Sequence, residues 1–450
     1  MSRKTRKNRI SYNHNNSNIM IQGKRAAVSK DGWIRVQIYG QPFPRGFAHG
    51  YLLSSELQRI HDMFPFIIKD QLKTSYQQYE KDCREKITPH IQKLFPEFFE
   101  EMQGISSGAI SAGFPNITFD FIVAWNSLLS TYTIYDHKKI LERCSSFISI
   151  ENGNILMAHN THTDYLTGKT TNIIMDIIPD KGNRMVIQMS PGYICSGMDW
   201  FICENGIIGC ESTIGDINYT PEFGAPYYCR IRQAMQYGNS LDDYVKIMLE
   251  NNAGDYPCSW FFGDTKRKEI MMFELAFKTH SIERKKEGVF YGVNSVMDQK
   301  MRKKETVDKD FGNTETSSGA RNMRLHYLLY EKFAGKMTVA NAKTIITDHY
   351  DVYLDENTNG NSRTVCKHIG DDLYPFGCTD GKVIDTKMAK KMSFLGRFGL
   401  PCGQSFSAKK HISKYPKYKK WEPYLEDMPS RPWTILRPLS TSFSTSIQSS

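Results

Sequence analysis

The chain has 450 residues and a mass of 51.8 kDa, enough for a large core in one elaborate domain or in two or three average ones. Its 40% hydrophobic and 24% charged residues are typical of an ordinary globular protein, not of a disordered or membrane-embedded one. The net charge is +10, but residues 1–30 carry eight lysines and arginines and no acid, so the remainder is close to neutral.

Residues 1–30 are also rich in Asn and Ser, which predicts a disordered basic arm. A basic arm without a basic face or groove-reading element argues against a specific nucleic-acid partner. The chain shows neither the apolar run of about 7–15 residues of a signal peptide nor the roughly 18 of a membrane span. We therefore expect no signal peptide and no transmembrane segment; cytoplasm is the favoured location, although the compartment stays open.

The first regular element after the arm is an alternating stretch over 32–40, which predicts a strand. Apolar residues then recur at three- and four-residue intervals from 54 to 111, interrupted by Pro89 and Pro96, and 118–129 continues the helical pattern. The segment 31–143 is thus one strand followed mostly by helix.

At Cys144 the pattern changes to short β-rich runs separated by Asn-Gly turns. We predict strands over 146–150, 154–158, 172–178, 184–189, 200–203 and 207–211, a hairpin over 260–263 and 269–275, and helices over 227–251, 321–333 and 339–349. Antiparallel strands flanked by helices indicate an α+β layered domain over 144–406. Residues 407–450, rich in Lys, Pro, Ser and Thr, are expected to form a loosely packed basic extension.

The ten cysteines are scattered singly, which favours free thiols in a reducing compartment over a disulfide framework. None of them forms the close pairs of a zinc site, and His349, Asp351 and His368 do not have the spacing of metal ligands. We therefore expect no metal site and no cofactor.

Cys144 is the candidate nucleophile, because it heads a predicted strand and His159-Asn160 follow one hairpin later. Cleavage of the Arg143–Cys144 bond would free an α-amine with a pKa of about 7.7–8.0, suited to accept the thiol proton near neutral pH. No separate histidine base is then required. The alternative is a buried structural cysteine.

Four further residues are candidates for the same site, each with a structural alternative. Asn160 would donate to the oxyanion or merely end a strand; His159 would orient the thiol or sit in the core. Thr213 would present its hydroxyl or backbone amide. Arg321 would bind a substrate carboxylate or phosphate, or pair with an internal acid.

Ten short segments in collinear order resemble those of the N-terminal-nucleophile cysteine hydrolases of the phospholipase B-like group and of the related penicillin-acyltransferase-like group. The resemblance spans roughly 32 to 406. The segments are Arg45-Gly-Phe-Ala-His-Gly50, Glu101-Met-Gln-Gly-Ile-Ser-Ser-Gly108, Arg143-Cys-Ser-Ser-Phe147, Ala158-His-Asn-Thr161, Pro191-Gly-Tyr-Ile-Cys-Ser-Gly197, Glu211-Ser-Thr-Ile-Gly215, Asn251-Asn-Ala-Gly254 with Ser259-Trp260, Gly319-Ala-Arg321, Phe376-Gly-Cys-Thr-Asp-Gly-Lys382 and Gly399-Leu-Pro-Cys-Gly403.

The resemblance implies a four-layer αββα sandwich of antiparallel sheets flanked by helices, with a precursor cut before Cys144 and a retained, propeptide-like segment 31–143. It implies hydrolysis of ester or amide bonds in small acylated substrates, including phospholipids, without a cofactor. The chain departs from the pattern at His162, where members commonly carry Trp, and at Cys258, near where they usually offer an oxyanion Asn. An acyltransferase and a non-catalytic binding or structural descendant therefore remain as alternatives.

Overall fold

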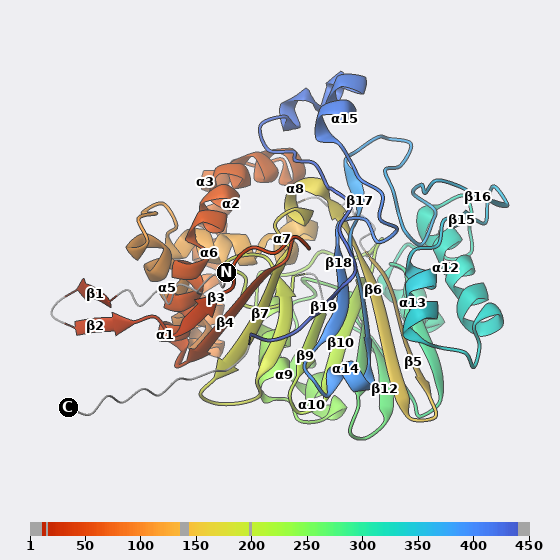
Figure 1. Ribbon diagram of the computed structural model, residues 1–450, viewed down its shortest axis with the longest axis horizontal. Helices are drawn as coiled ribbons and strands as arrows, with labels where there is room; N and C mark the ends of the chain where they lie inside the picture. Colours follow the sequence, from red (N-terminus) through yellow and green to blue (C-terminus); the bar gives the residue numbers. More distant parts are fainter. Residues whose placement is uncertain (1–10, 15–16, 136–143, 198–199, 440–450) are drawn as a thin grey trace, which may run out of the picture.

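The computed structural model describes residues 11–14, 17–135, 144–197 and 200–439. Arg143, one side of the predicted cleavage site, lies outside these residues. Within them, two large β-sheets and eighteen helical segments, α1–α15 and η1–η3, form a mixed α+β fold, which confirms the predicted class (Figure 1). No helix in the described part of the chain is long and apolar enough to cross a membrane.

The larger sheet has nine strands in the order β13-β12-β11-β10-β9-β8-β7-β4-β3. Neighbouring strands are antiparallel except β4 and β7, which are parallel. The strands are β3 (Gly23–Arg25), β4 (Ile34–Gly40), β7 (Ile173–Pro179), β8 (Met185–Met189), β9 (Trp200–Cys203), β10 (Ile207–Thr213), β11 (Cys258–Asp264), β12 (Glu269–Leu275) and β13 (His280–Lys285).

The second sheet has six antiparallel strands in the order β14-β5-β6-β17-β18-β19. Its strands are β5 (Cys144–Glu151), β6 (Asn154–Asp164), β14 (Gly288–Gly292), β17 (Phe376–Asp385), β18 (Phe394–Phe398) and β19 (Thr434–Leu436). β5 and β6 form the predicted hairpin, with Glu151 opposite Asn154. The two loop residues, Asn152 and Gly153, both have positive φ, as the tight hairpin turn requires.

The two sheets pack face to face through a shared apolar core. Ile148 and Met157 of the six-stranded sheet belong to the same buried cluster as Trp200 and Phe261 of the nine-stranded sheet. Because side chains alternate along a strand, every second residue of β5 and β6 points into this space between the sheets. The other residues point toward the helices on the outer face.

Helices cover the outer face of the nine-stranded sheet, at the left of Figure 1 for the N-terminal ones. These are α1 (Pro42–Leu52), α2 (Ser54–Ile67), η1 (Ile68–Leu72), α3 (Tyr76–Lys86), α4 (Thr88–Leu94), α5 (Pro96–Ser111), α6 (Phe119–Asn126), α7 (Leu128–Tyr135), α9 (Tyr227–Tyr237) and α10 (Leu241–Leu249). The predicted helical span 54–111 is therefore several helices. Pro89 and Pro96 stand in the first turns of α4 and α5, where a missing N–H costs nothing.

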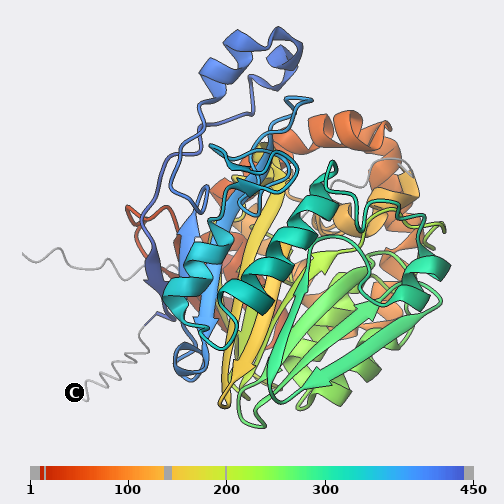
Figure 2. The same cartoon turned by 90° about the vertical axis from the view of Figure 1, so that its right-hand side faces the viewer.

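On the outer face of the six-stranded sheet lie α12 (Ser317–Tyr327), η2 (Leu328–Lys332) and α13 (Val339–Ile346), seen across its strands in Figure 2. The shorter elements are β1 (Ser11–His14), β2 (Ser17–Met20), α8 (Tyr165–Gly168), α11 (Gln299–Glu305), β15 (Tyr350–Asp351), β16 (Glu356–Asn357), α14 (Thr386–Ala389), α15 (Ala408–Lys414) and η3 (Pro416–Trp421).

Two of the segments that carried the family resemblance pack against each other as α1 and α5. A Cβ atom at Gly46 would lie 2.0 Å from the carbonyl oxygen of Glu101, and one at Gly108 2.0 Å from that of Phe47. The glycines therefore permit close backbone contact between the helices. Arg45 forms a buried ion pair with Glu101 across the same interface, 2.7 Å apart. These two segments therefore form a helix–helix interface in the core.

Both ends of the described chain are more ordered than expected. Gly23–Arg25, within the predicted disordered arm, forms the edge strand β3 paired with β4. The predicted loose extension contains buried Trp421 and Met428, and β19 completes the six-stranded sheet. Apolar residues among the lysines of this segment account for the difference. The proposed boundary at residue 143 divides chain segments that share one sheet, because β4 pairs with β7.

Candidate active site at the start of β5

Cys144 is the first residue of β5, a strand flanked on both sides. It lies opposite Thr161 of β6, and extending the pairing of β14 with β5 brings Asn294 beside it on the other side. Only 2% of Cys144 is exposed. Its carbonyl oxygen accepts hydrogen bonds from Arg321 Nη1 at 2.7 Å and from Ser212 Oγ of β10 at 3.4 Å. The start of β5 is thus fixed to both neighbouring layers.

Arg321, on α12, is fully buried and holds the polar groups around Cys144 together. Besides the Cys144 carbonyl, its guanidinium donates to Ser145 Oγ at 3.1 Å and to Asn294 Oδ1 at 2.8 Å. Its Nε donates to the Ser317 carbonyl at 3.2 Å. The planar fork therefore contacts backbone and side chains of the site itself, which positions them. The predicted contact with a substrate anion or an internal acid stays a prediction.

Asn294 is a site residue that the sequence analysis missed. Its Nδ2 donates to the Thr213 carbonyl at 2.9 Å, and its own carbonyl accepts from the Gly215 N–H at 2.8 Å. Its φ of 92° is rare for any residue but glycine, and such strained positions concentrate at functional sites. No sequence signal pointed to it, because β14, the strand that ends two residues before Asn294, was not among the predicted strands.

Thr213 ends β10 on the nine-stranded sheet. Its hydroxyl lies 3.0 Å from the Tyr256 hydroxyl and 3.4 Å from Glu211 Oε1. Its carbonyl contacts Asn294, so Thr213 is joined to the Cys144 region through the Asn294 and Arg321 side chains. Cys258, a departure from the family pattern, starts β11 directly opposite Thr213 and is also buried.

The structure separates His159 from Asn160, which the sequence places side by side. Asn160 lies opposite Ser145 and points to the helical face of the sheet, where its Nδ2 donates to the carbonyls of Ile346 and Val365 at 2.6 and 3.3 Å. His159 points into the space between the sheets, where its Nε2 lies 3.1 Å from the Glu211 carbonyl. By strand alternation Cys144 shares the face of His159. Asn160 is therefore not brought to the thiol side.

Both histidines of β6 are held in the neutral form. Burial and the positive charge of Lys382 lower the pKa of His159 well below its ordinary value. Burial, together with Arg321 and Lys367, does the same to the pKa of His162, which stands opposite Cys378 on the helical face. Neither imidazole carries charge near pH 7, so neither provides the cation of an ion pair with a thiolate.

A buried ion pair on the thiol side of the sheet was also missed. Lys382 and Asp380 of β17 are fully buried and 2.8 Å apart. Lys382 Nζ donates to the hydroxyl of Thr161, the residue opposite Cys144, at 2.7 Å. Asp380 accepts from Gln188 Nε2 at 2.7 Å. Lys382 lay inside a segment that carried the family resemblance, but no spacing rule connected it with Cys144.

A cavity of about 390 Å³ reaches this region from the surface. Asn294 and Ser318, the latter on α12, belong to its wall. The remaining lining is mostly polar: Gly215, Asp216, Asp310, Ser362, Lys367, Gly370, Asp371, Asp372, Tyr374 and Phe376. Cys144 itself is not among the lining residues, so a molecule in this cavity would contact Asn294 and not the thiol.

The structure also brings together two histidines and two cysteines whose spacing in the sequence did not predict a metal site. One ligand atom from each of His349, Cys366, His368 and Cys402 lies within 4.8 Å of the others. Sequence separation hid this group, because its members come from three loops. Asp351, considered with two of these histidines, instead forms an ion pair with Arg363 at 2.8 Å.

No protein-family model matches the chain. An uncharacterized protein of Archaeoglobus fulgidus is 24% identical over 266 residues, which cover 53% of this chain and 42% of that protein. Protein dcd1A of Dictyostelium discoideum is 25% identical over 257 residues, covering 51% of this chain and 54% of dcd1A. The matched stretch thus spans about half the length of these curated relatives.

Among solved structures, a mutant of the conjugated bile acid hydrolase from Clostridium perfringens aligns with a TM-score of 0.34 and 9% identity. The alignment covers 57% of this chain and 89% of that one. A likeness at this level carries no argument about function. The relationship to N-terminal-nucleophile hydrolases therefore stays a prediction from the sequence segments.

Proposed function

We propose that the protein is a self-processing cysteine hydrolase that removes acyl groups from amide or ester substrates, with Cys144 as the N-terminal nucleophile. The observation that carries the proposal is the construction around Cys144. Its carbonyl is held by Arg321 and Ser212, and Arg321 also holds Asn294 beside it. A buried structural cysteine requires no such convergence of donors from β10 and α12 on its carbonyl.

The reaction needs no group beyond the thiol, an amine and one oxyanion donor. After cleavage before Cys144, the freed α-amine takes the thiol proton, and the thiolate attacks the substrate carbonyl carbon. The resulting ammonium protonates the leaving amine or alcohol, leaving a thioester on Cys144. The amine then takes a proton from water, whose oxygen attacks the thioester and releases the carboxylic acid and the thiol.

Asn294 Nδ2 is our candidate oxyanion donor, in place of the predicted Asn160. Its amide lies beside Cys144 in the strand register and on the wall of the polar cavity. Reaching the oxyanion requires a side-chain rotation away from the Thr213 carbonyl. The loss of one such donor typically costs about 10²–10³ in kcat. Lys382, whose charge is balanced by Asp380, donates to the hydroxyl of Thr161 and so positions the residue opposite Cys144.

We further propose that the fold is the αββα sandwich of N-terminal-nucleophile hydrolases and that the two cleaved pieces remain associated. The support is that residues before Cys144 provide β4 and helices α1–α7, which share sheet and core with the residues after it. Separation would expose the apolar residues of that core to water, at a free-energy cost of about 25 cal/mol per Å² of apolar surface. The segment 31–143 would thus act as a retained propeptide.

The cavity favours a substrate with a polar leaving group. Asp216, Asp310, Asp371 and Asp372 line it together with Lys367, a wall better matched to an amine or head group than to a long acyl chain. Amides of amino compounds and phospholipid esters both meet this requirement. Their relative turnover would decide the substrate class.

Acylation of Cys144 tests the proposal. Purified protein would be incubated with an N-acyl amide, a phosphatidylcholine micelle and an activated acyl ester, and peptides mapped by mass spectrometry. We expect an acyl adduct on the peptide beginning with Cys144, absent in Cys144→Ala and retained in Cys83→Ala, which removes a buried cysteine of α3. Full turnover by Cys144→Ala would overturn the proposal. Product analysis with and without an amine acceptor separates hydrolysis from acyl transfer.

A further inference from the structure

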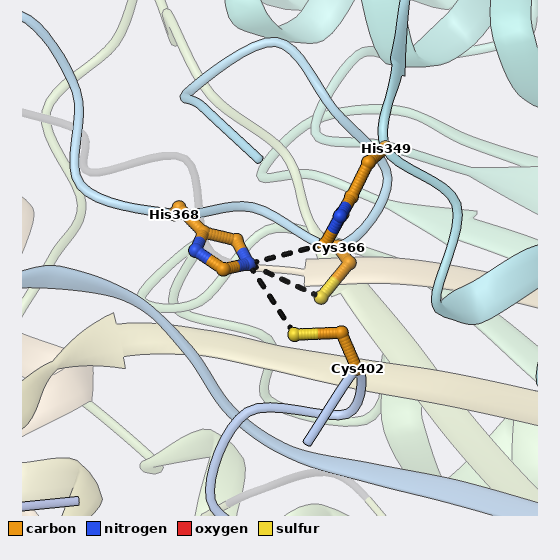
Figure 3. A group of neighbouring side chains, drawn as sticks. All are labelled: His349, Cys366, His368 and Cys402. Carbon is orange, nitrogen blue, oxygen red and sulfur yellow. Dashed lines mark hydrogen bonds between the residues drawn. The ribbon is translucent and has the colours of Figure 1, made fainter. Parts of the chain in front are cut away.

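Four side chains converge from three loops, which follow α13, precede β17 and follow β18, outside the site described above (Figure 3). His349 follows α13, Cys366 and His368 lie between β16 and β17, and Cys402 follows β18. The three loops are far apart in the sequence. Their only common feature here is that each turns a thiol or an imidazole nitrogen toward the same point.

The spacing of these atoms fits a tetrahedron around one metal ion. Zn²⁺ at about 2.0–2.1 Å from nitrogen and 2.3 Å from sulfur requires roughly 3.3 Å between two nitrogens and roughly 3.6 Å between nitrogen and sulfur. His368 Nε2 lies 3.2 Å from His349 Nε2, 3.5 Å from Cys402 Sγ and 3.7 Å from Cys366 Sγ. These three separations agree with the tetrahedral edge within a few tenths of an ångström, and all four ligand atoms lie within 4.8 Å of one another.

A hydrogen-bond network does not account for this arrangement. His368 Nε2 is close to three partners at once, as the dashed lines of Figure 3 show. One imidazole nitrogen has either one proton or one lone pair, so it forms one strong hydrogen bond and not three. A disulfide explains it no better: Cys366 and Cys402 are not so joined, and a disulfide would leave the converging imidazoles without a role.

The backbone around the cluster is shaped to hold the ligands in place. Gly360 has a φ of 96°, and a Cβ there would lie 2.3 Å from the His368 ring, so the ring occupies space that only glycine leaves. The His368 N–H donates to the Asn361 carbonyl at 2.9 Å. The Gln404 N–H points at Cys402 Sγ from 3.5 Å, as a donor to a thiolate ligand would.

Solvent reaches the cluster through a cleft of about 630 Å³, whose walls include His349, Cys402 and Gln404. An ion can therefore enter after the chain has folded. Four protein ligands complete a tetrahedral shell and leave no position for water or substrate, which is the arrangement of structural rather than catalytic zinc.

We propose that His349, Cys366, His368 and Cys402 bind one Zn²⁺ in a closed tetrahedral site. Two thiolates and two imidazoles at this spacing suit Zn²⁺ among common divalent ions. The ion ties the loop between β16 and β17 to the loop after β18 and to the end of α13. Lys367, between two of the ligands, lines the polar cavity near Asn294, so the zinc site fixes one wall of that cavity.

Metal content of the full-length, untagged chain purified without chelators tests the site. We expect about one equivalent of zinc per chain by elemental mass spectrometry. After stripping, Co²⁺ should give the absorption bands of tetrahedral cobalt with thiolate charge transfer, and Zn²⁺ should displace it. Cys402→Ser and His349→Asn should each weaken Zn²⁺ binding at least 100-fold, more than the roughly 10–100-fold typical of outer-shell changes.

Matched controls are Cys83→Ser, a buried cysteine of α3 far from the cluster in the chain, and His326→Asn on α12; both should bind Zn²⁺ as the parent does. Circular dichroism establishes that each variant is folded. An unmetallated parent that fails to take up micromolar Zn²⁺ overturns the site, as does a Cys366–Cys402 disulfide in peptide maps. An equivalent of another metal overturns the assignment to zinc. None of these readouts depends on Cys144 chemistry.

Discussion

Two cysteine-containing regions of this protein have different polar surroundings. At the start of β5, the Cys144 carbonyl accepts from a buried guanidinium and a hydroxyl, and Lys382 donates to Thr161 on the opposite strand. In the loops before β17 and after β18 of the same sheet, Cys366 and Cys402 face imidazole nitrogens. Donors and fixed positive charge favour a reactive thiolate, whereas converging lone pairs favour a shared cation. The neighbours of a cysteine, more than its burial, indicate its chemistry.

The largest expected effect comes from substituting one cysteine in each region and measuring both acyl-substrate turnover and zinc content. Cys144→Ser should reduce kcat/KM for an acyl substrate by about 10³-fold or more while keeping the zinc, because the nucleophile alone is changed. Cys402→Ser should lose the zinc while Cys144 still acquires the acyl adduct. Parallel kinetic assays and elemental analysis check both. Loss of both properties in either folded variant would contradict the separation of the two regions.

Asn294→Ala should lower kcat by about 10²–10³-fold, because it removes the proposed oxyanion donor. The matched variant is Asn160→Ala on the opposite face of β6, where the amide holds the Ile346 and Val365 carbonyls. That loss should decrease the free energy of unfolding by about 1–3 kcal/mol with kcat little changed. Steady-state kinetics and denaturant titration separate the outcomes; the reverse ranking of kcat would restore Asn160 as the donor.

Zinc removal should lower the Tm of every variant that keeps His349, Cys366, His368 and Cys402, whether or not Cys144 is present. Binding to the folded state at a hundredfold excess over Kd contributes about 2.7 kcal/mol, so a chelator should lower Tm by several degrees. Cys144→Ala should show the same decrease, and Cys402→Ser should show none. Calorimetry with and without chelator measures this. A Tm indifferent to chelator in the zinc-bound parent would contradict the clamp between the loops.

The smallest expected effect is that of His159→Asn on the pH dependence of kcat/KM. The pKa of His159 lies well below its ordinary value because the ring is buried near Lys382, so the imidazole is deprotonated throughout the assay range. The acid limb of kcat/KM should then follow the α-amine near about 7.7–8.0, and His159→Asn should leave that limb in place. A limb near 6.5 that disappears in this variant would identify His159 as the base.

Sequence patterns predicted the structural features that depend on residues close together in the chain. The Asn-Gly turn and the strand-like pattern after Cys144 predicted the β5–β6 hairpin. Pro89 and Pro96 were predicted only to interrupt a helical span, and the structure places them in the first turns of α4 and α5. Sequence patterns failed where a site is assembled across layers. Asn294 meets Cys144 through the pairing of β14, and no periodicity predicts which strand pairs with which.

The same limit explains the errors. His159 and Asn160 are adjacent in the chain, but strand alternation sends them to opposite faces, and the correct face depends on which side each sheet packs. His349 and Cys402 are separated by more than fifty residues and meet only when β18 and α13 are in place. Spacing rules for zinc find ligands within one loop, and this group draws on three.

The identity of the mature N-terminus tests the central claim most directly. Intact-mass analysis and N-terminal sequencing of purified protein should find two associated polypeptides, the second beginning with Cys144, and Cys144→Ala should remain one uncut chain. A parent that hydrolyses acyl substrates as a single 51.8 kDa chain, or cleavage that persists unchanged in Cys144→Ala, would contradict a self-processing N-terminal nucleophile.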